Sequence, residues 1–198
     1  TDGTVRVREV TPRTPQETTP AVRQERREGV EIAASLLARF GYADTGRNLT
    51  IADEAFNPAQ LCEAVVAILE PRFESEKITL EYSFSADTGQ FYRGDAGRVR
   101  QVLMNLLGNA LKFTHHGTVQ LKVDAIDDQQ QQSRLRFEVI DTGIGIDAEQ
   151  QTRLFDSFFQ VDATRTSKYG GSGLGLAITK EIVELHHGKI SLESPPKN

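Results

Sequence analysis

The chain has 198 residues, of which 38% are hydrophobic and 26% are charged, and its formal net charge is −5. This length suits one domain of ordinary size, and this composition predicts a soluble globular protein. The negative charge argues against nucleic acid as a partner, and no apolar run approaches the ~20 residues that cross a bilayer, so we expect no membrane contact. The single cysteine, Cys62, fits a cytoplasmic protein or the cytoplasmic part of a membrane-anchored receptor.

The first residues of the chain differ from the rest in composition. Pro12, Pro15 and Pro20 cannot lie inside a helix, because each lacks a backbone N–H and restricts the residue before it. We therefore predict that residues 1–27 form a linker or a disordered tail. Apolar side chains then recur at helical spacing until two glycines end the pattern, which predicts a helix within residues 28–47.

From residue 48 onward the pattern alternates between helix and strand. Asn57 is a suitable helix cap and Pro58 suits a first turn, so a helix is predicted to begin there and to end near Glu74. Further elements follow from apolar spacing. In chain order they are a strand over 78–84, a helix over about 95–114, strands over 119–125 and 135–139, helices over 147–154 and 175–186, and a strand over 189–193.

The connection between two of these strands indicates the fold class. A polar tip at residues 129–132 joins them, and this loop is too short for a crossover helix. The two strands are therefore predicted to form an antiparallel hairpin. Hairpin-joined strands mixed with several helices indicate an α+β sandwich, in which one mixed sheet carries helices packed on one face. A doubly wound parallel sheet is disfavoured.

Two asparagines and a lysine share one face of the helix over 95–114. Asn105 and Asn109 are four residues apart and Lys112 follows three residues later, so helical geometry places all three on one side. Amide oxygens suit Mg²⁺, which takes few protein ligands besides phosphate oxygens and waters. The face is a candidate metal and phosphate site, and an ordinary solvated surface explains it equally well in isolation.

Two glycine-rich segments add to this candidate site. Asp141 ends a strand and enters a turn with Gly143 and Gly145; the glycines admit a flat ligand, and the carboxylate can accept a hydrogen bond from the amine of adenine. The motif alone favours a simple Asx-type turn. The second segment, residues 170–175, precedes a helix and suits an anion. A polar, basic stretch between Phe158 and Gly170 is typical of a mobile lid.

In this order, the segments resemble the catalytic ATP-binding domain of two-component sensor histidine kinases, a family that belongs with gyrase and the heat-shock chaperone ATPases. The resemblance covers about residues 48–193. It matches residues 105–112 to the family's N box, 141–146 to its first glycine box, 155–159 to its F box and 171–175 to its second glycine box.

The resemblance implies a Bergerat-type α/β sandwich and a catalytic domain over residues 48–198 from which the family's last strand is missing. It identifies residues 28–47 with the end of a dimerisation helix and a hinge. It also suggests the hybrid type of kinase.

The resemblance further implies roles for individual residues. Asn109, with Asn105, would bind Mg²⁺, Lys112 would lie near phosphate, and Asp141 would bind the adenine amine of ATP. Asn105 and Lys112 are therefore the implied catalytic residues. The implied nucleotide contacts are Asn105, Asn109, Lys112, Asp141, Gly143, Gly145, Ile146, Phe158, Lys168, Gly171, Ser172, Gly173, Leu174, Gly175 and Leu176.

The chain departs from the family in its phosphoacceptor and in its lid. The acceptor motif His-Glu-x-Arg-Thr-Pro is absent, and Val10 stands in the place of its histidine. Ser167 stands where many relatives have an arginine, which weakens the case for Arg-assisted transfer. We interpret the histidines that the chain does contain as surface or helix-end residues: His115, His116, His186 and His187.

One position helps to choose a function within the superfamily. Its hydrolysing members resemble one another in having a Glu four residues before the metal Asn, where this chain has Asn105. An amide is a poor base near pH 7, so the site is expected to hold ATP without fast hydrolysis. The expected acceptor of the γ-phosphoryl is a histidine on a dimerisation domain of the same or a partner protein, with a response regulator receiver domain downstream.

Three other functions remain open on the sequence. The first is a degenerate, non-enzymatic regulator that binds a partner kinase through the same fold. The second is an ATP-driven conformational clamp, which Asn105 disfavours. The third is a Ser/Thr anti-sigma-factor kinase, which the type of lid disfavours.

Overall fold

The structure is a computed structural model, and it describes residues 3–7, 51–85, 91–127, 133–160 and 173–194. Contacts within the chain define one compact unit of residues 1–12 and 51–198. The second unit, residues 13–50, lies outside the described residues. The predicted helix end and hinge at 28–47 fall there as well.

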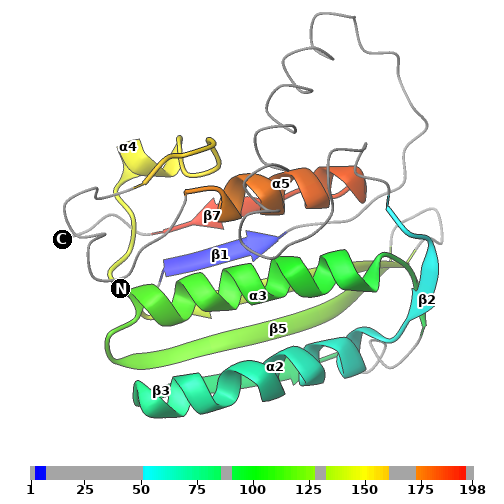
Figure 1. The fold of residues 1–198 in the computed structure, drawn as a ribbon, viewed down its shortest axis with the longest axis horizontal. Helices are drawn as coiled ribbons and strands as arrows, with labels where there is room; N and C mark the ends of the chain where they lie inside the picture. The colour runs from blue at the N-terminus through cyan, green and yellow to red at the C-terminus, as the bar shows by residue number, and fades with distance from the viewer. Residues whose placement is uncertain (1–2, 8–50, 86–90, 128–132, 161–172, 195–198) are drawn as a thin grey trace, which may run out of the picture. The chain divides into compact units, whose positions relative to one another are not determined.

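Within the described residues, one mixed sheet has the strand order β3-β5-β6-β1-β7, and helices cover one of its faces (Figure 1). β3 pairs with β5 in parallel, and the other neighbours in this sheet are antiparallel. The predicted α+β sandwich is confirmed. The strands of the sheet are β1 (Gly3–Val7), β3 (Ile78–Phe84), β5 (Gly117–Asp127), β6 (Ser133–Asp141) and β7 (Ser191–Glu193).

The helices follow the predicted positions closely. They are α2 (Pro58–Ser75), α3 (Ala96–Phe113), the short α4 (Ala148–Gln151) and α5 (Gly175–Leu185). Asn57 caps α2 as expected, because its Oδ1 accepts a hydrogen bond from the backbone N–H of Gln60 at 3.0 Å. Asp95 caps α3 in the same way, accepting from the N–H of Arg98 at 2.9 Å. These bonds satisfy donors that a helix start leaves without an internal partner.

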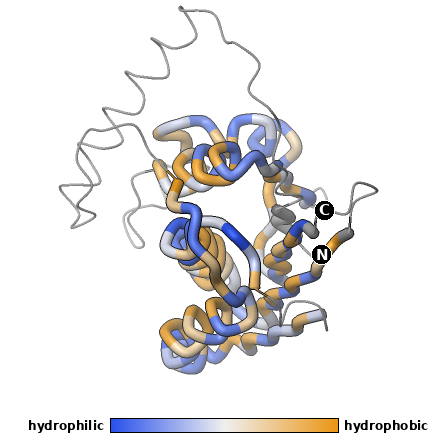
Figure 2. The backbone as a smooth tube through the Cα atoms, turned by 90° about the vertical axis from the view of Figure 1, so that its right-hand side faces the viewer, coloured by the Kyte–Doolittle hydropathy of each residue, from blue (hydrophilic) through white to orange (hydrophobic). Residues whose placement is uncertain are grey.

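The core lies between α2, α3, α5 and the covered face of the sheet. Along the tube of Figure 2, hydrophobic and hydrophilic residues alternate within the helices and strands, so each element presents one apolar side. The fully buried side chains of largest volume include Leu69 and Phe73 of α2, Leu103 and Leu107 of α3, Leu121 of β5 and Ile182 of α5.

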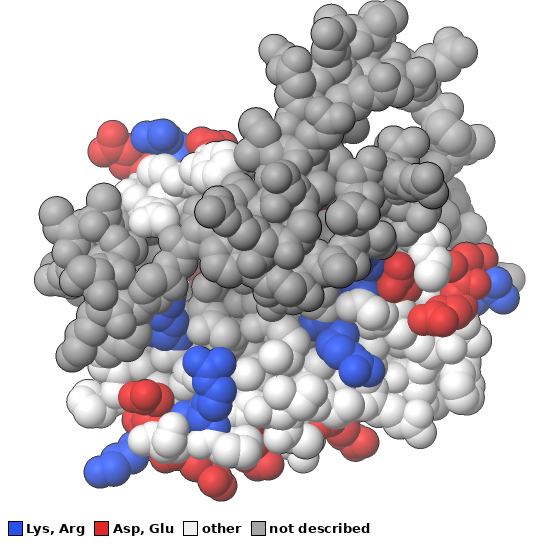
Figure 3. Space-filling model, in the orientation of Figure 1, with Lys and Arg blue, Asp and Glu red and all other residues white. Residues whose placement is uncertain are grey.

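The other face of the sheet is polar. Lys122 of β5 lies opposite Glu138 of β6, and Asp124 lies opposite Arg136. Opposite charges in directly facing positions stabilise an antiparallel pair, so this face can remain open to water without a third layer. Figure 3 shows the opposite side of the molecule, on which the helices lie, and there too Lys and Arg side chains are interspersed with Asp and Glu. In the part that the structure describes, no helix is both long and apolar enough to cross a membrane.

Strand β1 corrects one prediction. We expected residues 1–27 to form a linker or a tail, and this is wrong for Gly3–Val7, which pair with β6 on one side and with β7 on the other. Val5 and Val7 alternate with Arg6 as in a strand, and the prolines that begin at Pro12 outweighed this short pattern in our prediction. The conformation of this run is decided by ladder bonds to strands at the opposite end of the chain. Residues 8–27 lie outside the described residues.

A second small ladder also escaped prediction. β2 (Glu54–Phe56) pairs antiparallel with β4 (Tyr92–Gly94). A fork of hydrogen bonds supports it, because the Arg93 guanidinium donates to both carboxylate oxygens of Asp53 at 3.0 and 2.9 Å. The hydrogen bond from Arg93 lowers the pKa of the Asp53 carboxyl below its ordinary value. Three-residue strands are too short for an apolar alternation to be visible in the sequence.

Cys62 supplies a prediction about stability and pH. The side chain is completely buried in α2, and burial, assisted by the charge of Glu63, raises the pKa of its thiol from 9.0 to about 12. The folded state therefore favours the neutral thiol. This contribution to stability is fully present below pH 9, and it is lost as the pH rises toward 12.

We expect the difference in unfolding free energy between the parent and Cys62→Ala to shrink as the pH rises above 9. Urea titrations at several pH values measure this difference, and groups common to both proteins cancel from it. A difference independent of pH would contradict the raised pKa. As a control, a thiol reagent at pH 8 should modify the parent only after unfolding.

Candidate functional site

The candidate site is built on the face of α3 that points away from the core. Leu103, Leu107 and their neighbours on the sheet side are buried, whereas Asn105, Asn109 and Lys112 are each half-buried. The predicted division of this helix into an apolar and an amide-bearing face is confirmed. Within the described residues, the Asn109 amide makes no hydrogen bond, so its oxygen can serve a ligand.

Asn105 joins α3 to α5. Its Nδ2 donates a hydrogen bond of 2.7 Å to Oγ1 of Thr179, a residue that is only 1% exposed. Its Oδ1 lies against the first residue of α5, because a Cβ added at Gly175 would overlap that oxygen. Gly175 is therefore required for close approach of the two helices. The amide of Asn105 fixes the glycine-rich start of α5 beside the polar face of α3.

The first glycine-rich loop, residues 141–146, packs on the end of α3. Oδ1 of Asp141 accepts a hydrogen bond from the backbone N–H of Gly143 at 2.9 Å, which is the predicted Asx-type turn. The N–H of Ile144 donates to the Phe113 carbonyl at 3.3 Å. A Cβ added at Gly143 would lie 2.6 Å from the same carbonyl oxygen. Since a carboxylate accepts up to four hydrogen bonds, the turn and a ligand can share Asp141.

The far end of the same loop is held by the residue that follows β7. The N–H of Ile146 donates to Oγ of Ser194 at 2.9 Å. Nε2 of Gln151, from α4, bridges the carbonyls of Ile146 and Ser194 at 2.8 and 3.0 Å. Gly145, between these anchors, has a φ of +69°, a conformation that glycine adopts without strain. The loop from Asp141 to Ile146 is thus fixed at both ends.

The two ends of the predicted lid lie together. The N–H of Phe158 donates to the carbonyl of Gly173 at 3.1 Å, and both residues have positive φ angles, +64° and +70°. A Cβ at Gly173 would meet the backbone of Phe158 at 2.9 Å. The non-glycine Phe158 holds this conformation at a cost of ~1–3 kcal/mol, which is typical of functional segments.

The remaining predicted residues divide into two groups. Leu174 and Leu176 lie at the start of α5, and Leu174 is buried. Nζ of Lys112 lies 5.0 Å above the ring of Phe113, next to the docked glycine loop. The other candidates, together with the lid substitution at Ser167, lie outside the described residues: Lys168, Gly171 and Ser172.

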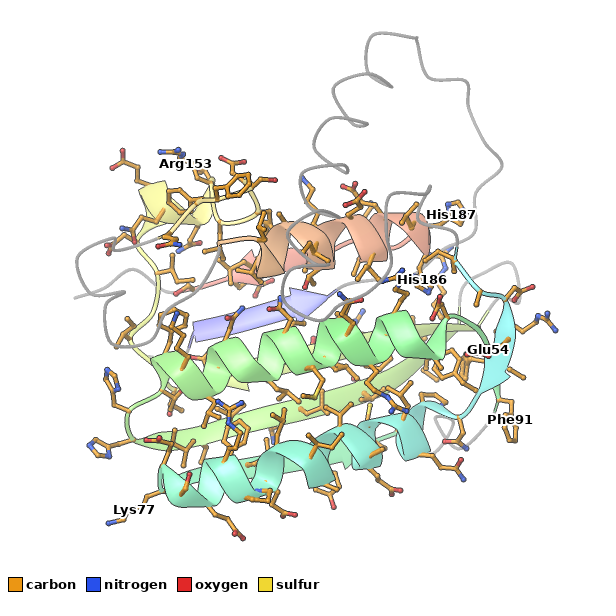
Figure 4. The ribbon with its side chains drawn as sticks, in the orientation of Figure 1. Glu54, Lys77, Phe91, Arg153, His186 and His187 are labelled. Atoms are coloured by element: carbon orange, nitrogen blue, oxygen red, sulfur yellow. The ribbon has the colours of Figure 1, made fainter. Side chains whose placement is uncertain are left out.

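His186 closes the opposite end of α5. Its Nε2 accepts a hydrogen bond from the N–H of Asp95 at 3.3 Å, and its Nδ1 lies 2.9 Å from the carbonyl of Ile182. Nε2 acts as the acceptor and Nδ1 faces a carbonyl oxygen, so both ring nitrogens have partners within the fold. In Figure 4 His186 lies at the end of α5, and His187 follows it with an exposed side chain. The interpretation of His186 as a helix-end residue is confirmed.

The donor set can be tested for its fit to a metal. No group of three or more His, Cys, Asp or Glu side chains that could hold an ion occurs in the described parts of the chain. The described residues by themselves therefore do not form a full protein cage for a metal. Mg²⁺ does fit, because it accepts one or two protein oxygens and takes the rest from phosphates and waters. Asn109 offers such an oxygen. Asn105 offers its Oδ1 as well, while its Nδ2 is bonded to Thr179.

Two residues that matter here were not singled out by sequence reasoning. Thr179 orients Asn105, and Ser194 holds Ile146. Thr179 lies four residues after Gly175, so helical spacing could have placed it on the side that faces α3. Nothing in the local sequence points to Ser194, since its contact depends on how β7 lies beside the loop.

Comparison with known proteins agrees with the family resemblance that the four motifs indicate. Residues 94–198 match the family described as histidine kinase-, DNA gyrase B- and HSP90-like ATPases. The peroxide stress-activated histidine kinase mak2 of Schizosaccharomyces pombe is 36% identical over 169 residues, which are 83% of this chain and 7% of that protein. The sensor histidine kinase AruS of Pseudomonas aeruginosa is 42% identical over 139 residues, or 70% of this chain and 14% of that protein.

A solved structure is also similar. Full-length ShkA in complex with AMPPNP superposes with a TM-score of 0.59 at 30% identity, over 90% of this chain and 39% of that one. The chain therefore spans a small part of each of these relatives.

The bond between Asn105 and Thr179 leads to a prediction about stability. Thr179→Val keeps the shape of the side chain and removes the acceptor of a buried hydrogen bond, so it should lower the unfolding free energy by about 1–3 kcal/mol. Thr179→Ser retains the hydroxyl, so its unfolding free energy should fall by less than that of Thr179→Val. Denaturant titration of the three proteins measures both effects, and equal stability of the Val variant and the parent would contradict the assigned bond.

Two glycines provide a matched pair of substitutions. Gly143→Ala places a Cβ against the Phe113 carbonyl and should destabilise the fold by about 1–3 kcal/mol, the range for a forced backbone shift. A Cβ at Gly108, inside α3, meets no atom within 4 Å. Gly108→Ala should therefore stabilise the helix by about 0.5–1 kcal/mol. Thermal unfolding should show shifts of opposite sign; shifts of the same sign would contradict the close approach at Gly143.

Proposed function

Because the chain belongs to the family of histidine kinase-, DNA gyrase B- and HSP90-like ATPases, we propose that it binds Mg-ATP and donates the γ-phosphoryl group to a histidine of a dimerisation domain. The acceptor domain belongs to the same or a partner protein. A response regulator receiver domain would take the phosphoryl group next. We propose a cytoplasmic site of action, because ATP and the receiver domains are there.

The observation that carries this proposal is the position of two anchored elements beside one face of α3. The loop at Asp141 is docked on the Phe113 carbonyl at the end of that helix. Asn105, in the middle of α3, contacts Gly175 at the start of α5 and donates a hydrogen bond to Thr179 in the same helix. A polar face bounded by a carboxylate loop and by a glycine-rich helix start has the groups that a purine, a metal and phosphates require.

Each group has a distinct task in this proposal. Asp141 accepts the hydrogen bond of the adenine amine, and the amides in the first turn of α5 bind phosphate oxygens. Asn109 supplies an oxygen ligand to Mg²⁺, which, when bound, neutralises charge on the phosphates. Lys112 lies one turn further along the same face and orients the terminal phosphates. The proposed catalytic contribution is positioning and charge stabilisation, which account for most of phosphoryl transfer.

Asn105 supports transfer rather than hydrolysis. Its Nδ2 is engaged by Thr179, and an amide cannot take a proton from water near pH 7. The site can therefore hold ATP until a stronger nucleophile arrives. His186 does not suit that role, since both of its ring nitrogens are occupied within the fold. We therefore place the acceptor on another domain, since the acceptor motif is absent from this sequence.

Asn109→Ala should abolish the Mg²⁺-dependent part of nucleotide binding and leave the fold intact, because Asn109 is half-buried and lies away from the leucine face of α3. Titration with a fluorescent ATP analogue, with and without Mg²⁺, measures the effect. The control is Glu63→Ala, which removes an exposed polar side chain from α2. An unchanged Mg²⁺-dependent affinity of the Asn109 variant would refute the metal assignment.

Asp141→Asn should weaken ATP binding by about 1.5–3 kcal/mol, the range for hydrogen bonds to a charged group. Guanine lacks the exocyclic amine at that ring position, so the parent should bind GTP poorly. Calorimetry of both nucleotides with both proteins separates the base contact from the phosphate contacts. Comparable affinities of the parent for ATP and GTP would contradict the role of Asp141.

Phosphotransfer tests the function directly. With γ-labelled ATP the chain alone should show negligible self-phosphorylation and slow hydrolysis, because the nucleophile is absent. A supplied dimerisation domain with its histidine should become labelled with acid-labile phosphate. Labelling of His186 or His187 would overturn the proposed acceptor. Failure to bind ATP would leave the non-enzymatic regulator as the better explanation.

A further inference from the structure

Strand β1 occupies an interior place in the sheet although it comes from the beginning of the chain. Its residues pair with β6 on one side, with Val5 opposite Val139, and with β7 on the other, with Val5 opposite Leu192. β6 and β7 are not neighbours in the strand order. In Figure 1 β1 lies next to β7, in agreement with this order. Within the described residues, the sheet connection between β6 and β7 therefore runs through β1.

The two strands that β1 joins are those that hold the ends of the first glycine loop. β6 ends at Asp141, and the register places Gly3 opposite this residue. β7 ends at Glu193, opposite Thr4, and is followed directly by Ser194, which accepts the hydrogen bond from Ile146. The loop thus begins on one neighbour of β1 and is fastened to the chain just beyond the other.

The spacing of β6 and β7 consequently depends on β1. Neighbouring strands lie about 4.8 Å apart, so an intervening strand holds its two neighbours at about twice that distance. With β1 displaced, both strands would expose an unpaired edge, and the distance between Asp141 and Ser194 would no longer be set by the ladder. The other contacts of the loop do not set this distance. The Phe113 carbonyl and the Thr118 carbonyl hold its first half beside α3 and β5, and Gln151 joins Ile146 to Ser194 itself.

We propose that residues Gly3–Val7 are a positioning strand of the nucleotide site: by pairing with both β6 and β7, they hold Asp141 and Ser194 at the separation that shapes the glycine loop. This inference rests on the proposed binding of ATP. It assigns to the first residues of the chain an effect on nucleotide affinity without any contact between β1 and the ligand.

The remainder of the core should persist without β1. α2 and α3 pack on each other, and their main contacts with the sheet are with β3, β5 and β6. None of the bonds within the β3–β5 and β5–β6 ladders involves the first residues. Loss of β1 is therefore expected to loosen the loop and β7 selectively. This separates a positioning role from a general contribution to folding.

The test uses proline in the full chain. Successive residues of a strand direct their N–H groups to opposite sides, so Val5→Pro and Arg6→Pro each remove a ladder bond to a different neighbour. Both variants should bind a fluorescent ATP analogue roughly tenfold more weakly, a change of about 1.4 kcal/mol. Glu9→Pro, beyond the last residue of β1, is the matched control and should bind as the parent does.

Amide hydrogen exchange supplies the second readout. In the proline variants the Ile146 amide should exchange faster, while amides of β3 and β5 keep the protection of the parent. A synthetic peptide of residues 1–10, added in excess, should restore both affinity and protection to Val5→Pro. The same peptide with proline in place of Val5 should not.

The outcomes separate the hypotheses. Unchanged affinity and unchanged Ile146 exchange in both variants would overturn the positioning role. Loss of protection throughout β3 and β5 would overturn it as well, since β1 would then be a general requirement for folding. If the parent binds no ATP, the proposed function fails, and the exchange of Ile146 still tests the strand.

Discussion

The structure depends on the two faces of α3. One face buries leucines against the sheet, and the hydrophobic effect that stabilises this contact fixes the helix in place. The opposite face carries amides that must find polar partners or a ligand. Asn105 finds one in Thr179 and brings α5 alongside, and the last carbonyl of the helix receives the glycine loop. The site is therefore assembled around a helix that the core has already immobilised.

Close approach between backbones explains why the site is rich in glycine. Gly175 admits the amide of Asn105, and Gly143 admits the Phe113 carbonyl; a methyl group at either place would overlap the neighbouring oxygen. Gly173 permits the turn that joins the two ends of the lid segment. The residues to which we assign phosphate binding thus also allow the elements to pack. This double requirement connects the fold of the domain to the proposed binding of a nucleotide.

Much of the fold could be predicted because local signals were strong. Asn57 and Pro58 predicted the start of α2. The leucine spacing of α3 predicted both its length and its buried face, because burial of an amphipathic helix follows its 3.6-residue period. The hairpin of β5 and β6 followed from a short polar tip. The prediction failed at β1, where we expected a tail, and at the ladder of β2 and β4. Three-residue strands are too short to show an alternation, and in β1 the alternation of Val5 and Val7 with Arg6 was outweighed by the prolines that follow.

By itself, the sequence determined the order of the motifs, the family, and the chemical types that the site offers: amides, one carboxylate, one lysine and glycines. Those features depend on residue identity and on spacing within single elements. Only the tertiary structure decided that Asn105 is oriented by Thr179, that Ser194 and Gln151 hold Ile146, and that the first residues of the chain lie between β6 and β7. These contacts join residues far apart in the chain, and their geometry is set by the packing of helices on the sheet, to which no local pattern refers.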